Sequence, residues 1–174
     1  MAAGGTRDLT LADALAIGRQ VPTVRAVAPV SVGVSMAQHG DLSRSITFVG
    51  TTAEFLRIRS LRVVSGQNLP EGDVETSSPV CLIGCRLQQE LLKDAGPLGA
   101  VIRLGDYRFR VIGILAPTGT SLGADVDEMV VVPVSLAQRM VNREGLFRVL
   151  VEVGSVHRME EAKEAIRKLL VERH

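Results

Sequence analysis

Apolar and polar residues alternate with a period of two over residues 30–36, which predicts a β-strand. Its apolar positions are Val30, Val32, Val34 and Met36, and small or polar residues stand between them. The sequence QHGD at residues 38–41 predicts a turn. In the return strand that follows, we expect Ile46 and Phe48 on one face, and Thr47 and Val49 on the other. Together these segments predict an antiparallel hairpin.

A second hairpin is predicted within residues 101–112. After a first run, VIRL, the residues Tyr107, Phe109 and Val111 alternate with Arg108, Arg110 and Ile112. The two runs are separated by Gly105 and Asp106, a pair that suits a two-residue hairpin turn. The glycines of this region therefore indicate turns and irregularities of a sheet rather than a loop that binds phosphate.

Helices are predicted from capping signals and from apolar spacing. Thr10 with Asp13, and Thr51 with Glu54, each have the spacing of a capping box at a helix start. The first of these helices is expected at residues 9–20, and the last helix of the chain at residues 157–173. We expect the buried face of this last helix to consist of Met159, Ala162, Ile166 and Leu169.

The order of the elements predicts an α+β fold that contains an insertion. Strands are expected at PVCLIG, MVVVP and FRVLVEV, the first two of them buried, and irregular segments at residues 67–78 and 117–128. Helices and strands alternate at both ends of the chain, whereas the middle is rich in strands. We therefore expect residues 1–60 and 128–174 to form one discontinuous subdomain. Residues 61–127 are expected to form an inserted, β-rich subdomain of strand, helix and hairpin.

The composition argues against several classes of function. Apolar residues make up 46% of the 174 residues, which is enough to build a core. A net charge of +1, and an aromatic content of 3% without tryptophan, argue against a nucleic-acid partner. No apolar run approaches the ~18 residues that would span a bilayer, and the first residues lack the pattern of a signal peptide. We therefore expect a soluble chain, which is compatible with its being one piece of a larger protein.

The two cysteines do not predict a redox site. Cys81 lies in a predicted buried strand, and Cys85 stands at the start of a predicted helix. Their spacing is C-x-x-x-C rather than the C-x-x-C of redox motifs. A disulfide between them stays open, but buried or free thiols are the favoured interpretation.

The histidines do not predict a nucleophilic site. His39 falls in a turn, His157 at a helix start and His174 at the chain end. Nucleophilic hydrolysis needs a serine or cysteine beside a base that a third group orients. Because the sequence contains no G-x-S-x-G motif, we expect three surface histidines rather than a triad.

Acidic residues and glycines near residue 125 do not predict a ligand site either. Asp125, Asp127 and Glu128 lie close together, but the donors and the glycine of a calcium loop are missing. The glycine-containing residues 119–123 are not followed by the lysine that a phosphate-binding loop requires. We therefore expect no catalytic, cofactor-binding or metal-binding residues, and no enzymatic activity.

Six segments, in a fixed order, carry a resemblance to a known family. They are VPTVRAVAPV, VGTTAEFLRIRSLRVVSGQNL, PVCLIGCRLQQELL, PLGAVIRLGDYRFRVIGIL, DEMVVVPVSLAQRM and FRVLVEVGSVHRMEEAKEAIRKLL. Their order resembles the extracytoplasmic, periplasmic core domain of MacB-type ABC transporter permeases, which are related to FtsX-like permeases. Gln67, Cys81 and Cys85 depart from the residues usual in that family. The family's membrane helices are not in this sequence, so the chain would correspond to the region between the first two of them.

The resemblance implies a porter-like subdomain, built from both chain ends, that carries the inserted subdomain outside the cell membrane. It also implies a non-catalytic role, in which the domain couples ATP-driven movement of membrane helices to a periplasmic partner or substrate. The implied partners are the permease's own transmembrane helices, a cytoplasmic ATPase, a periplasmic adaptor or substrate, and a second copy in a homodimer. Nothing in the sequence identifies the cargo.

Two alternatives stay open, namely a free-standing small-molecule-binding α+β enzyme and a soluble adaptor. A deep cleft lined by converging polar groups would favour the enzyme. A domain inserted between two membrane helices should instead have Leu11 and Leu170, near the two chain ends, on the same side of the fold.

Overall fold

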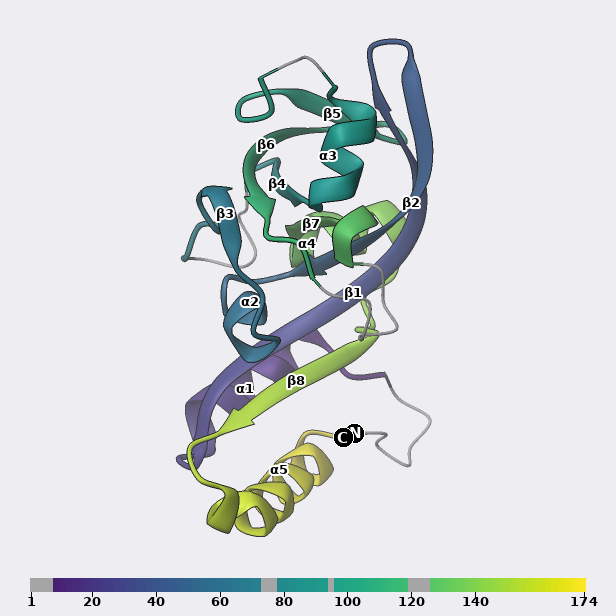
Figure 1. Ribbon diagram of the computed structural model, residues 1–174. Coiled ribbons are helices and arrows are strands. Elements are labelled where there is room, and N and C mark those ends of the chain that lie inside the picture. Colours follow the sequence, from purple (N-terminus) through teal and green to yellow (C-terminus); the bar gives the residue numbers. More distant parts are fainter. Residues whose placement is uncertain (1–7, 73–77, 94–95, 119–125) are drawn as a thin grey trace.

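The computed structural model describes residues 8–72, 78–93, 96–118 and 126–174, and it shows the α+β fold that the sequence predicts (Figure 1). The helices are α1 (Leu11–Gln20), α2 (Glu54–Ile58), α3 (Cys85–Leu91), α4 (Val134–Val141) and α5 (Met159–Arg173), with 3-10 turns η1 (Val126–Glu128) and η2 (Val156–Arg158). The strands are β1 (Val24–His39), β2 (Leu42–Thr51), β3 (Val63–Gly66), β4 (Val80–Ile83), β5 (Val101–Leu104), β6 (Tyr107–Leu115), β7 (Val130–Pro133) and β8 (Arg148–Val153).

Six of the strands pair in a closed ring. β1 pairs with β2, β2 with β7, β7 with β4, β4 with β6, β6 with β5, and β5 again with β1. The β2–β7 and β4–β6 pairs are parallel, and the other four are antiparallel. Outside the ring, β3 pairs with β6, and β8 pairs with β1.

The strand β1 belongs to two parts of this sheet. Over residues 24–30 it pairs with β8, and over residues 31–39 it pairs with β2. Near its end, Ala37 and Gln38 also pair with β5. Figure 1 shows β1 running from the end of the molecule that holds α1 and α5 toward the end that holds β5 and β6. The strand is longer than the alternating residues 30–36 because β8 holds the preceding residues in extended form as well.

Both predicted hairpins are confirmed. The β1–β2 register runs from Ser31 opposite Gly50 to His39 opposite Leu42. In the second hairpin, Leu104 lies opposite Tyr107, and the intervening Gly105 has a φ of 59°. Glycine adopts this left-handed backbone region without the steric cost that a Cβ atom would impose.

Two apolar clusters lie on opposite faces of the sheet. Ile46 and Phe48 belong to a cluster that α3 and α4 cover, and Val49 belongs to a cluster that α2 and β3 cover. The predicted alternation along β2 is therefore confirmed. The packing is close at Gly33, where an added Cβ would overlap the ring of Phe48 and lie 2.8 Å from Cγ1 of Val141.

The predicted capping box of Thr51 and Glu54 is wrong. Thr51 is the last residue of β2 and pairs with Pro133 of β7. The helix α2 begins later, at Glu54, and its N-cap residue Ala53 makes no side-chain cap. Strand pairing thus uses the residue that the local motif assigned to the helix.

The predicted buried face of the last helix needs one correction. Ala162, Ile166 and Leu169 are buried as expected, but Met159 is 38% exposed. The turn η2 takes up residues 156–158, so that α5 starts only at Met159. This side chain therefore stands at the helix end, outside the apolar cluster that the following turns form with α1 and β8.

Candidate functional site

The first turn of α1 and the last turn of α5 meet at the carboxylate of Asp13. The predicted capping box of α1 is confirmed, because the Asp13 amide donates to Oγ1 of Thr10 at 3.1 Å and the Thr10 amide donates to Oδ2 of Asp13 at 2.9 Å. Nε of Arg173 donates to Oδ1 of the same carboxylate at 2.7 Å, and Nε2 of His174 lies 2.8 Å from Oδ2. One side chain thus joins two helices from opposite ends of the chain.

Asp13 is charged although its side chain is only 1% exposed. Burial on its own would raise the pKa of this carboxyl group, because it removes water from the charged form. Hydrogen bonds from Arg173, the Thr10 amide and His174 outweigh burial and lower the pKa to about 2. The carboxylate is therefore the buried member of an ion pair whose other member, the Arg173 guanidinium, reaches the surface.

Apolar side chains bring the same two helices together. Ala16, Ile17 and Val21 form one cluster with Ile166, Leu169 and Leu170, which rests on side chains of β1 and β8. Leu11 packs on an adjacent cluster, and both clusters share Val27 and Val149. The expectation that Leu11 and Leu170 lie on the same side of the fold is confirmed, and Figure 1 shows α1 and α5 at one end of the molecule.

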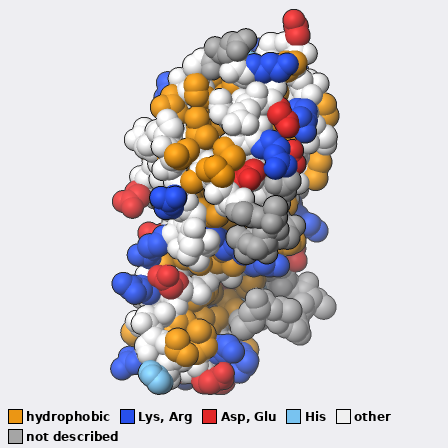
Figure 2. All heavy atoms as spheres, in the orientation of Figure 1, with side chains coloured by type: hydrophobic (Ala, Val, Ile, Leu, Met, Phe, Trp, Pro, Cys, Tyr) orange, Lys and Arg blue, Asp and Glu red, His pale blue; other side chains and the backbone are white. Residues whose placement is uncertain are grey.

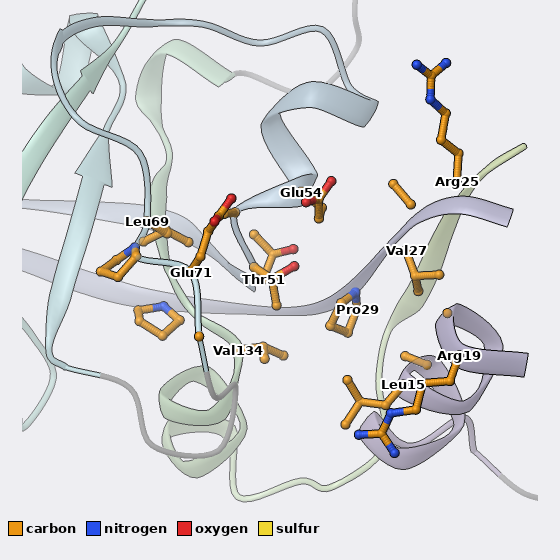
Figure 3. Close-up of a pocket in the computed structure, with 18 of the residues that line it drawn as sticks. Leu15, Arg19, Arg25, Val27, Pro29, Thr51, Glu54, Leu69, Glu71 and Val134 are labelled. Atoms are coloured by element: carbon orange, nitrogen blue, oxygen red, sulfur yellow. The ribbon is translucent and has the colours of Figure 1, made fainter. Parts of the chain in front are cut away.

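A groove of about 700 Å³ lies beside this junction, between α1, β1 and the segments that follow β2 and β3 (Figure 3). Its apolar lining includes Leu15, Val27, Pro29, Leu69 and Val134, and the charged residues in its described lining are Arg19, Arg25, Glu54 and Glu71. Figure 3 shows Thr51 between Glu71 and Pro29 in the middle of the lining. Among the described residues, the buried Oγ1 atoms of Thr51 and of its neighbour Thr52 have no hydrogen-bond partner.

The charges on the described lining of the groove have both signs and come from separate segments. Glu54 is held by Nη2 of Arg57 at 2.8 Å, outside the groove lining. Arg19 and Leu15 come from α1, whereas Glu71 comes from the segment after β3. This combination of apolar walls, hydroxyl groups and separated charges suits the binding of an amphiphilic molecule more than acid–base chemistry.

The structure does not bring the three histidines together. Nδ1 of His39 lies 3.1 Å from the carbonyl oxygen of Val101. His157 is exposed at η2, where its amide donates to Oγ of Ser155. His174 contacts the buried carboxylate of Asp13.

Asp127 and Glu128 each contact a residue outside the turn η1. Oδ1 of Asp127 accepts hydrogen bonds from the Thr118 amide at 3.0 Å and from its hydroxyl at 3.2 Å, and Glu128 lies 3.5 Å from Arg44. Asp125 and the glycines of residues 119–123 lie outside the described residues. Over the described ranges, no group of three or more His, Cys, Asp or Glu side chains could hold a metal ion.

Both cysteines are free thiols. Cys81 is fully buried in β4, and Cys85 is the first residue of α3. Burial raises the pKa of both thiols, and the nearby carboxylate of Asp127 raises that of Cys85 further. Neither thiol has the lowered pKa of a catalytic or redox cysteine.

Sequence reasoning assigned Asp13 to a helix cap and missed its partners Arg173, the last residue of α5, and His174, which follows it. A signal for its burial was present, because Asp13 precedes the apolar Ala16 and Ile17 by three and four residues and so shares their helix face. Its partner Arg173 is 160 residues away in the sequence, and no local pattern links the two.

Comparisons with known proteins agree on one family. The family model described as "MacB-like periplasmic core domain" matches residues 2–169. The chain is 31% identical over 174 residues to the macrolide export ATP-binding/permease protein MacB of Nitrobacter winogradskyi, covering 98% of this chain and 27% of that protein. It is 34% identical over 169 residues to the pyoverdine export ATP-binding/permease protein PvdT of Pseudomonas entomophila, covering 95% of this chain and 26% of that protein. The chain thus spans about a quarter of the length of these curated relatives.

Solved structures show the same fold. The extracellular domain of the noncanonic ABC-type transporter YknZ from Gram-positive bacteria superposes with a TM-score of 0.83 at 19% identity, covering 98% of this chain and 86% of that one. The periplasmic region of MacB from Actinobacillus actinomycetemcomitans superposes with a TM-score of 0.80 at 19% identity, covering 94% and 73%. In the described part of this chain, no helix is both long enough and apolar enough to cross a membrane. By its match to the family model and by its relatives, this chain belongs to the family of MacB-like periplasmic core domains.

Proposed function

We propose that the chain is the extracytoplasmic domain of an ABC transporter permease and that it transmits movement mechanically. Tilting of membrane helices would displace the joined helices α1 and α5. This displacement would be passed to the opposite end, where β5, β6 and the tip of the β1–β2 hairpin meet a partner. The partners in this proposal are the permease's own membrane helices, its cytoplasmic ATPase, a periplasmic adaptor or substrate, and a second copy of the permease.

The continuity of β1 is the observation that carries the proposal. Its first half is paired with β8, on which α1 and α5 pack, and its second half is paired with β2 and β5. A strand of 16 residues extends on the order of 50 Å at about 3.3 Å per residue. Because both halves have hydrogen-bonded partners, displacement of one end moves the other end with it.

The two predicted subdomains have distinct tasks in this proposal. Residues 1–60 and 128–174 would form the body that follows the membrane helices. Residues 61–127 would be carried by that body through the pairings of β4 with β7 and of β5 with β1.

The proposal is tested by spin labels on the hairpin tip of the intact dimeric permease. Asp41, in the exposed β1–β2 turn, is replaced by a labelled cysteine in a background with Cys81→Ala and Cys85→Ser. We expect the distance between the two labels to change between the nucleotide-free and the ATP-bound protein. Asp13→Ala should reduce this change, whereas Arg167→Ala, at an exposed ion pair of α5, should preserve it. If the distance between the two hairpin-tip labels in the unsubstituted protein is the same with and without ATP, the proposal is overturned.

The groove supports a second candidate function, the binding of a small amphiphilic molecule. Its size of about 700 Å³ and the hydroxyl groups of Thr51 and Thr52, which have no hydrogen-bond partner among the described residues, favour this alternative. The relatives are named for the export of macrolides and pyoverdine, and both are suitable probes in equilibrium dialysis. Binding to the unsubstituted chain, and its loss in Leu15→Trp, which fills the groove, is the expected result for this candidate. Failure of both probes to bind would reject it.

A further inference from the structure

Three arginines lie on one face of the β5–β6 hairpin. Arg103 stands directly opposite Arg108, and Arg110 stands opposite Val101. The arginines are exposed, whereas the intervening Ile102 and Phe109, which also face each other, are buried. Because side chains alternate between the faces of a strand, the three guanidinium groups share the outward face of the sheet.

This arrangement lowers the stability of the hairpin. Like charges directly opposite each other in an antiparallel pair are destabilising. Within the described residues, Arg108 and Arg110 make no ion pair, and Nε of Arg103 donates to the carbonyl oxygen of Gly105 at 2.8 Å. Elsewhere on the molecule, Arg57, Arg167 and Arg173 each have a carboxylate partner. The hairpin thus presents positive charge that the described part of the fold does not neutralise.

Exposed apolar side chains continue the same face. Gln38 of β1 pairs with Arg103, which puts Met36 and Val34, at two and four residues from Gln38, on the arginine side of the sheet. Their exposed fractions are 45% for Met36 and 73% for Val34, and Val101 on β5 is 50% exposed. Apolar side chains of β1 and β5 therefore lie beside the arginines of β5 and β6 on one face of three adjacent strands.

We propose that this arginine face, made of Arg103, Arg108, Arg110, Val34, Met36 and Val101, docks a segment of a partner protein that carries both carboxylates and apolar residues. Guanidinium groups bind carboxylates through two parallel hydrogen bonds, and the exposed apolar side chains supply area to bury. The inference rests on the proposed function, since it places the partner at the end of β1 far from α1 and α5 (Figure 1).

The test measures binding of a fluorescently labelled peptide rich in glutamate and leucine to the chain at low ionic strength. The unsubstituted chain should bind this peptide, and should bind a counterpart with glutamine in place of every glutamate much more weakly. The triple variant Arg103→Gln, Arg108→Gln, Arg110→Gln should bind the acidic peptide about tenfold more weakly, because three exposed charge pairs are lost. The matched control Arg59→Gln, Arg62→Gln, Arg158→Gln has the same net charge and should retain the affinity.

A second variant separates docking from a role in the fold. Arg103→Glu places opposite charges across the hairpin, so the midpoint of urea unfolding should rise while affinity for the acidic peptide falls. Equal loss in both triple variants, or no binding of the acidic peptide, would overturn the proposal. So would arginine-dependent binding to phosphatidylglycerol vesicles in place of the peptide. The proposed mechanical function can survive these outcomes, because its test follows nucleotide-driven movement and involves no acidic ligand.

Discussion

Nε of Arg173 donates a 2.7 Å hydrogen bond to the buried carboxylate of Asp13, and so connects the last turn of α5 to the first turn of α1. The Thr10 amide and His174 occupy the other carboxylate oxygen. The apolar contacts of α1 and α5 are non-directional, whereas this ion pair fixes the register of one helix against the other. The two helices are therefore held together by directional as well as apolar contacts.

Replacing Asp13 with alanine should destabilise the fold by about 2–3 kcal/mol. The substitution removes a charged hydrogen bond, typically worth about 1.5–3 kcal/mol, together with part of the cap of α1. The released Arg173 side chain is one-third exposed and can be rehydrated, which limits the loss. Urea unfolding measures the effect. Glu164→Ala breaks only an exposed ion pair of α5 and should change stability by less than about 0.5 kcal/mol; equal effects of the two substitutions would contradict the assignment.

The same carboxylate predicts a loss of stability at acid pH. Its pKa falls from 3.8 to about 2 on folding, so the unfolded chain binds a proton more readily than the folded one. Asp13 therefore stabilises the fold above about pH 4, and this contribution disappears as the pH falls toward about 2. A difference of nearly two pKa units corresponds to about 2 kcal/mol. Unfolding curves measured across this range should show a steeper decline for the unsubstituted chain than for Asp13→Asn, and parallel declines would refute the prediction.

Alanine substitutions at two glycines should change the free energy of unfolding in opposite directions. Gly18 lies within α1, and a Cβ there would meet Cγ2 of Val27 at an ordinary 3.6 Å. Gly18→Ala should therefore raise the free energy of unfolding by about 0.5–1 kcal/mol. Gly33→Ala would press against Phe48 and Val141 and should lower it by about 1–3 kcal/mol. Thermal and urea unfolding of both variants check this pair, and a shift in the same direction would show that the packing around Gly33 yields easily.

The two thiols should differ in their accessibility to alkylation. Cys81 is 0% exposed, and burial raises its pKa, so it should react with iodoacetamide only when the chain unfolds. Cys85 is only partly buried and should be modified slowly in the folded chain. Mass spectrometry should find one label under native conditions and two in urea. Cys85→Ser should remain unlabelled until it unfolds, and rapid labelling of that variant would show that β4 opens locally.

Local patterns predicted the elements that depend on local physics. The alternation around Phe48 and Phe109 gave both hairpins their correct faces, and Thr10 with Asp13 gave the start of α1. At Thr51 the local pattern wrongly predicted a helix cap. This residue pairs with Pro133 on β7, a strand that lies about 80 residues further along the chain. The closed ring of strands likewise depends on pairings such as β1 with β5, which join residues distant in sequence.

The candidate sites were less accessible to prediction than the fold. The hydroxyl of Thr51 and the side chains of Leu15 and Glu71 line one groove only because α1 and two loops converge there. Side chains of both signs are spread over the face of the molecule in Figure 2, so charge composition alone did not single out Arg103 and Arg108. The register of β5 and β6 shows that these two arginines lie directly opposite each other.

The division of β1 between two sets of partners has a consequence for any attempt to dissect this domain. A cut just before Ser31 would separate α1 and the first part of β1, residues 24–30, from their partners β8 and α5, while residues 31–39 would stay paired with β2 and β5. Neither half would retain a complete set of backbone hydrogen bonds. The region around β8 and the terminal helices and the region around the ring are therefore expected to fold and unfold together, in a single cooperative transition. Each is expected to need the other in the same expressed polypeptide.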